Sequence, residues 1–441
     1  ATELLQLLSL LARVGMPSTR LRTRRISTAW NKLGRLGKSQ QHLSPFSNEG
    51  TTIPSDCKSK RKDIADDAEW DVIATSITAA ANPVSQEVDW ELPNVCSSET
   101  PPCSVSFTSS QKAFTSDRLT SAMDRLADFA TPWMEGAFAV VRILQEAPRN
   151  QANVIEMQAL SGKHAGKQVA VKKVPREWMM SSPDEFRRQR PNEIEQPWVD
   201  VGMIKELNTL KVPFVCELMG MFSDSKHFYI VQELGTEGDL FVWSSKLPQH
   251  YSLREEQMRP IVVQVCAAVR HLHDLGISHR DLSLENILVT KDFQDSALTI
   301  KVIDFGMSGL SRFAKGNKHG KHGYRAPEMH DEDEYDSFLA DNFAIGCIVY
   351  SVAFCRYPWA STTLGKDPCF DFAWTHGIGR FLALKPPPGE EGFGSMSSPL
   401  IEVLRGLLHM QAKRRASLGE ACYLSEKFRP CISHMEWMYA Q

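Results

Sequence analysis

Charged and amide side chains at four positions could together handle a phosphate ester. Lys172 ends a short β-type run that reads VAVK, and Asp304 follows a second such run and begins DFG. Asp281 and Asn286 belong to one segment that lies between them, HRDLSLEN. Carboxylate and amide oxygens are the ligands that Mg²⁺ prefers, and an ammonium can hold phosphate oxygens. The combination is typical of a site that transfers a phosphoryl group by positioning and charge neutralisation.

The four side chains would have separate tasks in such a transfer. Lys172 would hold the α- and β-phosphates of the nucleotide, and Asp281 would orient the accepting hydroxyl and take its proton. Asn286 and Asp304 would bind Mg²⁺. Each of these short motifs is common enough to occur by chance in an unrelated sequence. Chance does not account for all of them in this order and at these spacings.

Together with the APE motif at 326–328, these motifs resemble those of the eukaryotic protein kinase family. The resemblance covers residues 119–430 and implies an α+β, two-lobed fold. A small antiparallel, β-rich N-lobe with helix C would span about 119–234, and a larger, mainly helical C-lobe about 235–430. ATP and Mg²⁺ are the implied cofactors, and proteins are the implied substrates.

The family pattern implies which substrate class and which nucleotide contacts to expect. HRDLSLEN is more similar to the serine/threonine branch, and residues 358–381 are similar to a divergent group of algal and protist kinases. Gln232 would be the gatekeeper, and Glu233 and Gly235 would meet the adenine through their backbone. The residues expected around the nucleotide are Gly136, Val141, Ala170, Lys172, Gln232, Glu233, Gly235, Asp239 at the ribose and Leu288 under the adenine.

Other residues resemble the family's structural supports. Asp341 would grip the backbone of the catalytic loop, at His279 and Arg280. Arg415 would form a buried pair with Glu328 of the APE motif. The alternative for Arg415 is an exposed basic run over residues 413–417.

The glycine-rich loop of the family is degraded in this sequence. We place it at residues 134–141, where only Gly136 of the three glycines remains. Val141 is then farther from Lys172 than is usual in the family, which implies an insertion around residues 148–163. The loss of glycine should weaken the grip on the nucleotide without abolishing it.

The acid that pairs with Lys172 is ambiguous in the sequence. Asp200 is the favoured candidate because Val201, Ile204 and Leu207 would then lie on the core face of the same helix. Asp200 could instead lie in a solvated first turn, where acids suit the helix dipole. Glu193, Glu195 and Glu206 are the alternative partners.

Two further departures concern the catalytic loop and the activation loop. Ser283 replaces a lysine of the family pattern, and Lys321 replaces a threonine that would contact that lysine. We therefore expect Lys321 to bond Ser283 and to take over the catalytic role of the lost lysine, although an exposed loop lysine is the alternative. Residues 313–334 contain no Ser or Thr, so activity should not need a phosphate there.

Composition limits the remaining possibilities. Hydrophobic residues make up 42% and the net charge is −3, so neither nucleic acid nor membrane is an expected partner. No stretch looks long and apolar enough to span a bilayer, and ten scattered cysteines fit a reducing, cytoplasmic location. The arginine-rich start also resembles a transit peptide. The oligomeric state is left open.

The ends of the chain should lie outside the catalytic domain. Residues 1–118 are rich in Ser, Thr and Pro and are expected to be disordered, and residues 431–441 are expected to form a short tail. Two functions compete for the domain itself. An active kinase is favoured by the complete set of catalytic residues, and a pseudokinase that acts as a binding scaffold is favoured by the degraded glycine-rich loop.

Overall fold

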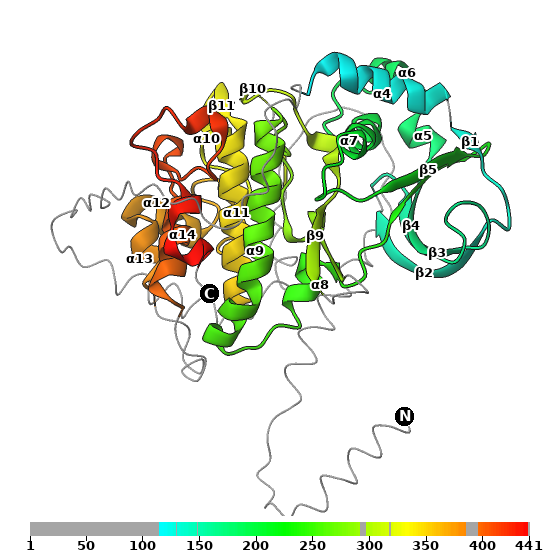
Figure 1. Cartoon of the computed structure of the whole chain (residues 1–441). Helices are drawn as coiled ribbons and strands as arrows, with labels where there is room; N and C mark the ends of the chain where they lie inside the picture. Colours follow the sequence, from blue (N-terminus) through cyan, green and yellow to red (C-terminus); the bar gives the residue numbers. More distant parts are fainter. Residues whose placement is uncertain are drawn as a thin grey trace, which may run out of the picture. The chain divides into compact units, whose positions relative to one another are not determined.

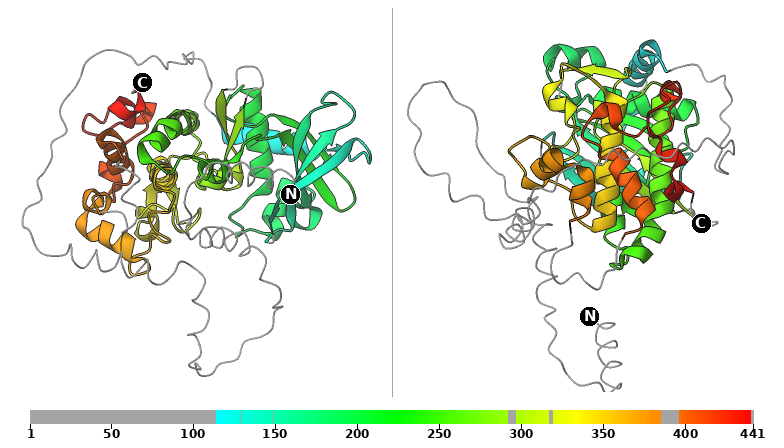
Figure 2. Two further views of the ribbon diagram at one scale, coloured as in Figure 1. Left: turned by 90° about the horizontal axis from the view of Figure 1, so that it is seen from below. Right: turned by 90° about the vertical axis from the view of Figure 1, so that its left-hand side faces the viewer.

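A computed structural model describes residues 114–128, 130–147, 149–291, 297–316, 319–384 and 396–439. Within them, a strand-rich N-lobe precedes a mainly helical C-lobe (Figure 1). Two further views place the sheet and the helical lobe beside each other (Figure 2). The predicted α+β, two-lobed architecture is therefore confirmed.

The N-lobe is built on a six-stranded sheet in the order β1-β5-β6-β4-β3-β2. All neighbouring strands are antiparallel except β1 and β5. β4, which carries Lys172, pairs with β3 and β6 and so lies inside the sheet. The strands are β1 (Thr131–Pro132), β2 (Phe138–Ala147), β3 (Ala152–Ala159), β4 (Gln168–Pro175), β5 (Leu218–Ser223) and β6 (His227–Glu233).

The two faces of this sheet have different neighbours. Side chains alternate along a strand, so Val171 of β4 points away from the face on which Lys172 lies. Val171 packs in a small cluster with Tyr229. Trp133 stacks on Tyr229 at a ring distance of 4.0 Å, which places the segment between β1 and β2 on this outer face.

Four helices cover the other face and edge of the N-lobe. They are α4 (Ser116–Asp128), α5 (Arg176–Met179), α6 (Pro183–Gln189) and α7 (Pro197–Thr209). α4 lies against α7, and its Leu119 and Met123 are buried (Figure 1). α4 begins at Ser116 and Phe114 is also buried, so packed residues start a few positions before the predicted boundary at residue 119. The rest of the expected disordered extension, residues 1–113, lies outside the described residues.

The C-lobe is organised around two long helices that lie side by side, α9 (Tyr251–Asp274) and α11 (Ser337–Phe354) (Figure 1). α9 ends just before Gly276, whose φ of 85° suits a residue that terminates a helix. The other helices are α8 (Leu240–Ser244), α10 (Glu328–Asp331), α12 (Pro368–His376), α13 (Ile378–Leu382) and α14 (Ser398–Leu407).

Short strands and 3₁₀ turns complete the C-lobe. The strands are β7 (Gly238–Asp239), β8 (Ile287–Lys291), β9 (Leu298–Val302), β10 (Phe313–Lys315) and β11 (Glu334–Asp336). The 3₁₀ turns are η2 (Leu284–Asn286), η3 (Phe305–Met307), η5 (Ala412–Arg414), η6 (Ala421–Tyr423), η7 (Ile432–His434) and η8 (Glu436–Met438).

α11 corrects the expectation that no segment is apolar enough to cross a membrane. Among the described residues it alone meets that criterion by length and hydropathy, but 94% of it is buried inside the C-lobe. Burial on all sides explains its apolar composition.

The segment after residue 430 is packed rather than a free tail. Ile432 and Trp437 are buried, and Trp437 Nε1 donates to Glu255 Oε1 of α9 at 2.8 Å. The predicted domain boundary at residue 430 thus divides a packed segment.

Candidate active site

Asp341 fixes the backbone of the catalytic loop from the buried helix α11. Its carboxylate accepts hydrogen bonds from the backbone N–H of His279 at 2.7 Å and of Arg280 at 2.8 Å. Arg280 has a φ of 66°, a conformation that non-glycine residues rarely adopt. His279 Nε2 in turn lies 3.0 Å from the Ile303 carbonyl, just before Asp304. The contact predicted for Asp341 is present.

Asp281 and Asn286 meet on this loop. Asn286 Nδ2 donates to the carbonyl of Asp281 at 2.7 Å and to its Oδ2 at 3.1 Å. These bonds use the amide nitrogen of Asn286, and its amide oxygen is the atom that would bind a cation. Burial raises the pKa of Asp281, and the nearby Asp304 carboxylate raises it further, while the Lys321 ammonium opposes this. A carboxyl of raised pKa beside a second carboxylate suits a group that takes a proton.

Lys172 lies between two carboxylates. Its Nζ is 2.8 Å from Asp200 Oδ2 of α7 and 3.8 Å from Asp304 Oδ1. Burial lowers the pKa of Lys172, but the two carboxylates outweigh it and the net shift is upward. Lys172 therefore stays protonated and can hold phosphate.

Asp200 has a second contact that joins α7 to the DFG segment. Its Oδ1 accepts from the backbone N–H of Phe305 at 2.9 Å. Of the candidates left open by the sequence, Asp200 is the residue that contacts Lys172. Glu206 instead pairs with two arginines of α4, and Glu193 and Glu195 pair with Arg149.

The donor set fits a magnesium–nucleotide complex. Asp304 and Asn286 each carry an oxygen donor, and Lys172 supplies an ammonium between Asp200 and Asp304. Asp304 is partly exposed, so its carboxylate is open to a ligand. Hard oxygen donors of this kind suit Mg²⁺, which these residues would hold against the phosphates.

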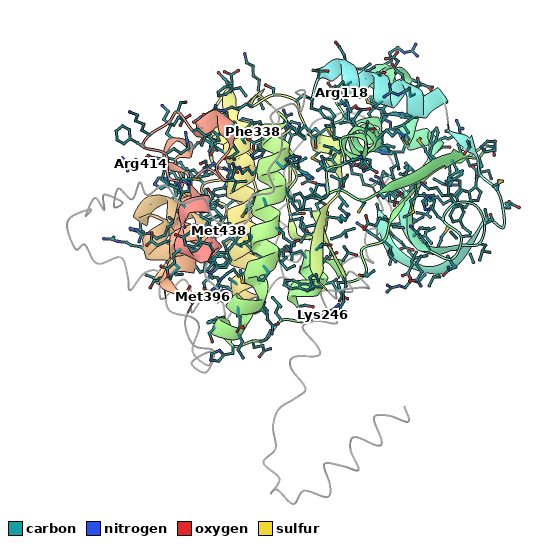
Figure 3. All side chains as sticks on the ribbon, in the orientation of Figure 1. Arg118, Lys246, Phe338, Met396, Arg414 and Met438 are labelled. Carbon is teal, nitrogen blue, oxygen red and sulfur yellow. The ribbon has the colours of Figure 1, made fainter. Side chains whose placement is uncertain are left out.

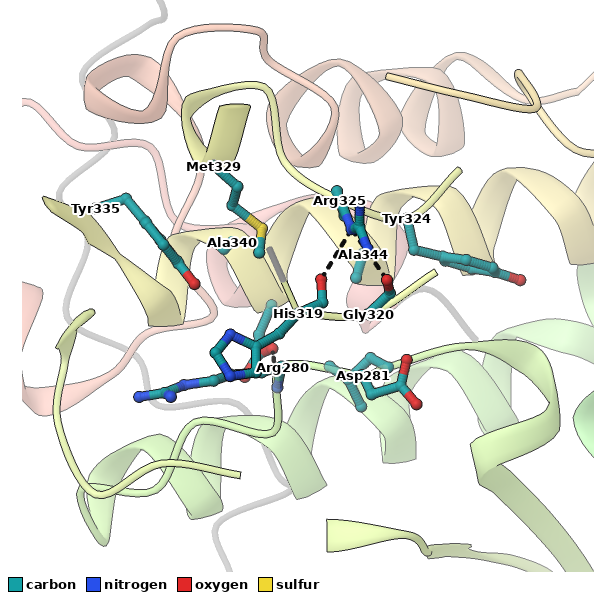
Figure 4. Close-up of a pocket in the computed structure, with 12 residues that line it drawn as sticks. Arg280, Asp281, His319, Gly320, Tyr324, Arg325, Met329, Tyr335, Ala340 and Ala344 are labelled. Atoms are coloured by element: carbon teal, nitrogen blue, oxygen red, sulfur yellow. Dashed lines mark hydrogen bonds between the residues drawn. The ribbon is translucent and has the colours of Figure 1, made fainter. Parts of the chain in front are cut away.

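Lys321 makes the contact that the sequence predicted and one that it did not. Its Nζ donates to Ser283 Oγ at 2.9 Å and also to Glu285 Oε2 at 2.8 Å. Gly320 next to it lies close to Asp281, and Arg325 donates to the carbonyls of His319 and Gly320 (Figure 4). The segment around Lys321 is thus fixed against the catalytic loop.

The hinge between the lobes brings the expected adenine and ribose residues together. A Cβ atom on Gly235 would lie only 2.9 Å from Leu288 Cβ, so glycine allows the chain to rest on Leu288. Gln232 of β6 lies opposite Ala170 of β4. Asp239 caps α8 by accepting from the backbone N–H of Val242 at 2.7 Å.

The structure overturns the assignment of the glycine-rich loop to residues 134–141. In the family pattern the loop that covers the nucleotide joins the two strands that precede the strand of Lys172 along the chain, and here these are β2 and β3. The described residues of their connection are 149–151. Gly136 belongs to the segment that crosses the outer face of the sheet, opposite Lys172, and Val141 lies in β2 with 48% of its surface exposed. Gly136 and Val141 therefore lie outside the connection between β2 and β3, and the distance along the chain from Val141 to Lys172 needs no insertion to explain it.

Charged residues lie at the hairpin and beside Ala170, where the family pattern places contacts to the nucleotide. Glu156 of β3 lies directly opposite Ala170, on the same face, and accepts from Arg142 Nε at 2.6 Å. Arg149 lies at the turn itself. From the sequence, both residues were missed because the loop was located from Gly136. The strand that pairs with the strand of Lys172 would have located it correctly.

Glu328 and Arg415 form the predicted buried pair. Arg415 Nη2 and Nη1 lie 2.9 and 2.5 Å from the two carboxylate oxygens of Glu328. The guanidinium also donates to the Leu339 carbonyl at 2.9 Å. The alternative, an exposed basic run around Arg415, is excluded.

Comparison with known proteins agrees with this geometry. Residues 156–425, more than half of the chain, match the family model described as "Protein kinase domain". A "Probable myosin light chain kinase" of Dictyostelium discoideum is 36% identical over 169 residues, 37% of this chain and 45% of the relative. Human "Calcium/calmodulin-dependent protein kinase type 1B" is 36% identical over 156 residues, 35% of this chain and 43% of the relative.

A plant relative gives a similar result. "CBL-interacting serine/threonine-protein kinase 26" of Arabidopsis thaliana is 33% identical over 168 residues, 36% of each chain. The chain thus spans less than half of the length of these three relatives. The family match and the catalytic constellation together show that this chain belongs to the protein kinase family.

Proposed function

We propose that the protein transfers the γ-phosphoryl group of Mg-ATP to serine or threonine hydroxyls of protein substrates. The observation that carries this proposal is the meeting of Lys172, Asp281, Asn286 and Asp304 from three separate segments: β4, the catalytic loop and the DFG segment. The similarity to the Arabidopsis serine/threonine-protein kinase supports the serine/threonine class.

Each side chain has a task that follows from its surroundings. Asp281 orients the acceptor hydroxyl and takes its proton as the oxygen attacks. Lys172 holds phosphate oxygens and is itself oriented by Asp200. Mg²⁺, when bound at Asp304 and Asn286, neutralises charge on the phosphates.

We further propose that Lys321 is the cation beside the transferred group. Its ammonium is fixed by Ser283 and Glu285, and it lowers the pKa of Asp281 against the effect of burial. A positive charge at this point stabilises the charge that develops on the phosphoryl oxygens.

A pseudokinase is the second candidate, and specific observations favour it. The turn at residues 149–151 contains no glycine, and the charged Glu156 lies opposite Ala170 in the roof of the nucleotide cleft. A scaffold of this kind would bind a nucleotide or a partner without turnover.

Turnover with purified protein separates the two candidates. The full chain is incubated with Mg-ATP and a mixture of protein substrates, and phosphoamino acids are identified in the products. Asp281→Asn and Asp304→Asn should each lower transfer at least about 100-fold while the melting temperature stays the same. Asp184→Asn, which changes an exposed acid on α6, is the matched control. If Asp281→Asn transfers phosphate at the wild-type rate, another group is the base.

A further inference from the structure

The turn between β2 and β3 carries a cationic side chain where the family pattern relies on backbone. Arg149 and Asn150 stand at this turn, and β3 leads from it along the strand of Lys172. The sequence from Glu146 to Asn153 contains no glycine. Such a turn cannot easily bring backbone N–H groups into close contact with phosphate.

Arg149 is held toward the segment that precedes α7. Its Nη1 lies 3.3 Å from Glu195 Oε2, and its Nη2 pairs with Glu193 Oε1. Asn150 Nδ2 donates to the other oxygen of Glu195 at 3.2 Å. The guanidinium also lies 5.7 Å from the ring of Trp178. Arg149 and Asn150 therefore both contact the carboxylate of Glu195.

Glu195 belongs to the charge cluster of the active site. The backbone N–H of Gln196, the next residue, donates to the Gly306 carbonyl at 2.8 Å, beside Asp304. Burial raises the pKa of Glu195, the Asp304 carboxylate raises it further, and the Lys172 ammonium opposes both. Arg149 thus pairs with a carboxylate that adjoins the positions of the metal and the phosphates.

We propose that Arg149 binds the phosphates of a nucleoside di- or triphosphate in place of a glycine-rich backbone loop. Glu193 and Glu195 hold its guanidinium when no nucleotide is bound. The inference rests on the proposed function, because that function places phosphate at Lys172 and metal at Asp304. A guanidinium presents several N–H donors in a plane and binds phosphate oxygens in pairs, so it can exchange carboxylate for phosphate.

Binding of ATP and of adenosine, each measured by calorimetry in the presence of Mg²⁺, tests the proposal. Arg149→Ala should weaken ATP binding by about 10- to 100-fold and leave adenosine binding unchanged, because only ATP carries phosphates. Arg149→Lys should bind ATP more tightly than Arg149→Ala and less tightly than the wild type. The matched control is Arg187→Ala on α6, since Arg187 is 50% exposed and paired with Asp184, and Arg149 is 57% exposed.

A second arm tests the two carboxylates. Glu193→Gln with Glu195→Gln should strengthen ATP binding, and this gain should shrink in the Arg149→Ala background. An equal gain in both backgrounds would show that the carboxylates simply repel phosphate and do not hold Arg149.

The outcome that overturns the proposal is ATP affinity in Arg149→Ala within about twofold of the wild-type value. Equal losses for ATP and adenosine would also overturn it, because they would indicate a structural role. Failure of the proposed function gives a different result. In that case ATP binding depends on Arg149 but no phosphoryl transfer is detected.

Discussion

The Lys321 ammonium lies between two hydrogen-bond acceptors, Ser283 and Glu285. These contacts fix the position of a positive charge beside the catalytic loop. Ser283 is fully buried, so its hydroxyl gives the ammonium a fixed anchor. Glu285 is partly exposed and holds the same ammonium from the open side. Burial raises the pKa of the Glu285 carboxyl, but Lys321 outweighs this and the net shift is downward. The position of the charge is therefore set by short contacts on both sides.

The exchange of residue types between positions 283 and 321 can be tested by a double-mutant cycle. Lys321→Thr should lower kcat about 100-fold and change ATP affinity little, because the charge acts on the transferring group. Ser283→Lys in the same chain should recover much of the loss. Lys315→Thr, which removes an exposed lysine of the same segment, should leave kcat unchanged. Full activity of Lys321→Thr would rule out a catalytic role.

At the scale of elements, α4 braces the helix that carries Asp200. Arg118 and Arg125 of α4 donate to the two carboxylate oxygens of the buried Glu206 on α7, each at 3.0 Å (Arg118 is labelled in Figure 3). A Cβ atom on Gly202 would lie 2.6 Å from Met123 Cγ, so glycine allows the two helices to approach closely. α4 precedes the residues that match the kinase family. The helix that carries Asp200 is therefore supported by an element outside the residues of the family match.

Charge reversal across this contact should show whether α4 sustains activity. Arg118→Glu with Arg125→Glu places three acids together, so α4 should detach, α7 should exchange its amide hydrogens faster, and kcat should fall about tenfold or more. Adding Glu206→Arg should restore a large part of both. If the reversed arginines leave hydrogen exchange in α7 unchanged, α4 does not brace it.

The activation loop is fixed by protein contacts. β10 pairs with β11, and Arg312 Nε lies 2.7 Å from Asp336 Oδ2, which also accepts from the Tyr423 hydroxyl at 2.8 Å. Residues 313–334 offer no Ser or Thr to a modifying enzyme. Among the described residues, these contacts hold the segment in place without a phosphate, so we expect activity not to depend on phosphorylation of this loop.

Phosphatase treatment of active enzyme should therefore change turnover less than about twofold. Arg312→Ala, in contrast, should lower turnover, because the guanidinium joins β10 to Asp336 and lies over the Tyr423 ring. Mass spectrometry before and after treatment gives the phosphate content. A large loss of turnover that follows removal of a phosphate from this loop would contradict the expectation.

The elements show where sequence reasoning succeeds and where it fails. The pair Glu328–Arg415 was predictable because short motifs fix the positions of both residues. Asp200 could only be favoured among several acids as the partner of Lys172, from the apolar face of its helix, and the contact itself settles the choice. The position of the hairpin over the nucleotide could not be predicted in this way. Gly136 suggested a glycine-rich loop at residues 134–141, whereas the position of the hairpin depends on which strands pair. α4 was missed for a related reason, since the burial of Phe114 depends on contacts far along the chain.

At the scale of the whole molecule, one buried histidine connects the catalytic loop to the end of the C-lobe. His273 Nε2 lies 3.1 Å from Asp341 Oδ2, and its Nδ1 lies 2.9 Å from Glu420 Oε1. The ring stacks on Phe338 at 4.3 Å (Phe338 is labelled in Figure 3). Asp341 in turn holds the backbone beside Asp281. The imidazole of His273 thus connects Glu420, near the end of the C-lobe, with Asp341, which holds the catalytic loop.

His273 makes stability depend on pH in a defined direction. Burial alone would lower the pKa of His273, but hydrogen bonds to Asp341 and Glu420 raise it to about 9 from an ordinary value of 6.5. The folded protein then binds one proton more than the unfolded chain between these two values. The stabilisation is complete below pH 6.5 and is lost as the pH rises through about 9, by at most about 1.4 kcal/mol per pH unit. The free energy of unfolding should therefore fall over this range.

Urea denaturation from pH 6 to 10 measures this slope, and His273→Gln should remove most of it. The variant should also be less stable than the wild type at pH 6, where the difference is largest, and should approach it above pH 9. Turnover should fall with stability in the variant, because Asp341 loses its cationic partner. His434→Gln, at an exposed histidine, is the control and should keep the wild-type slope. A slope that is the same in His273→Gln and the wild type would mean that His273 is not protonated in the folded protein.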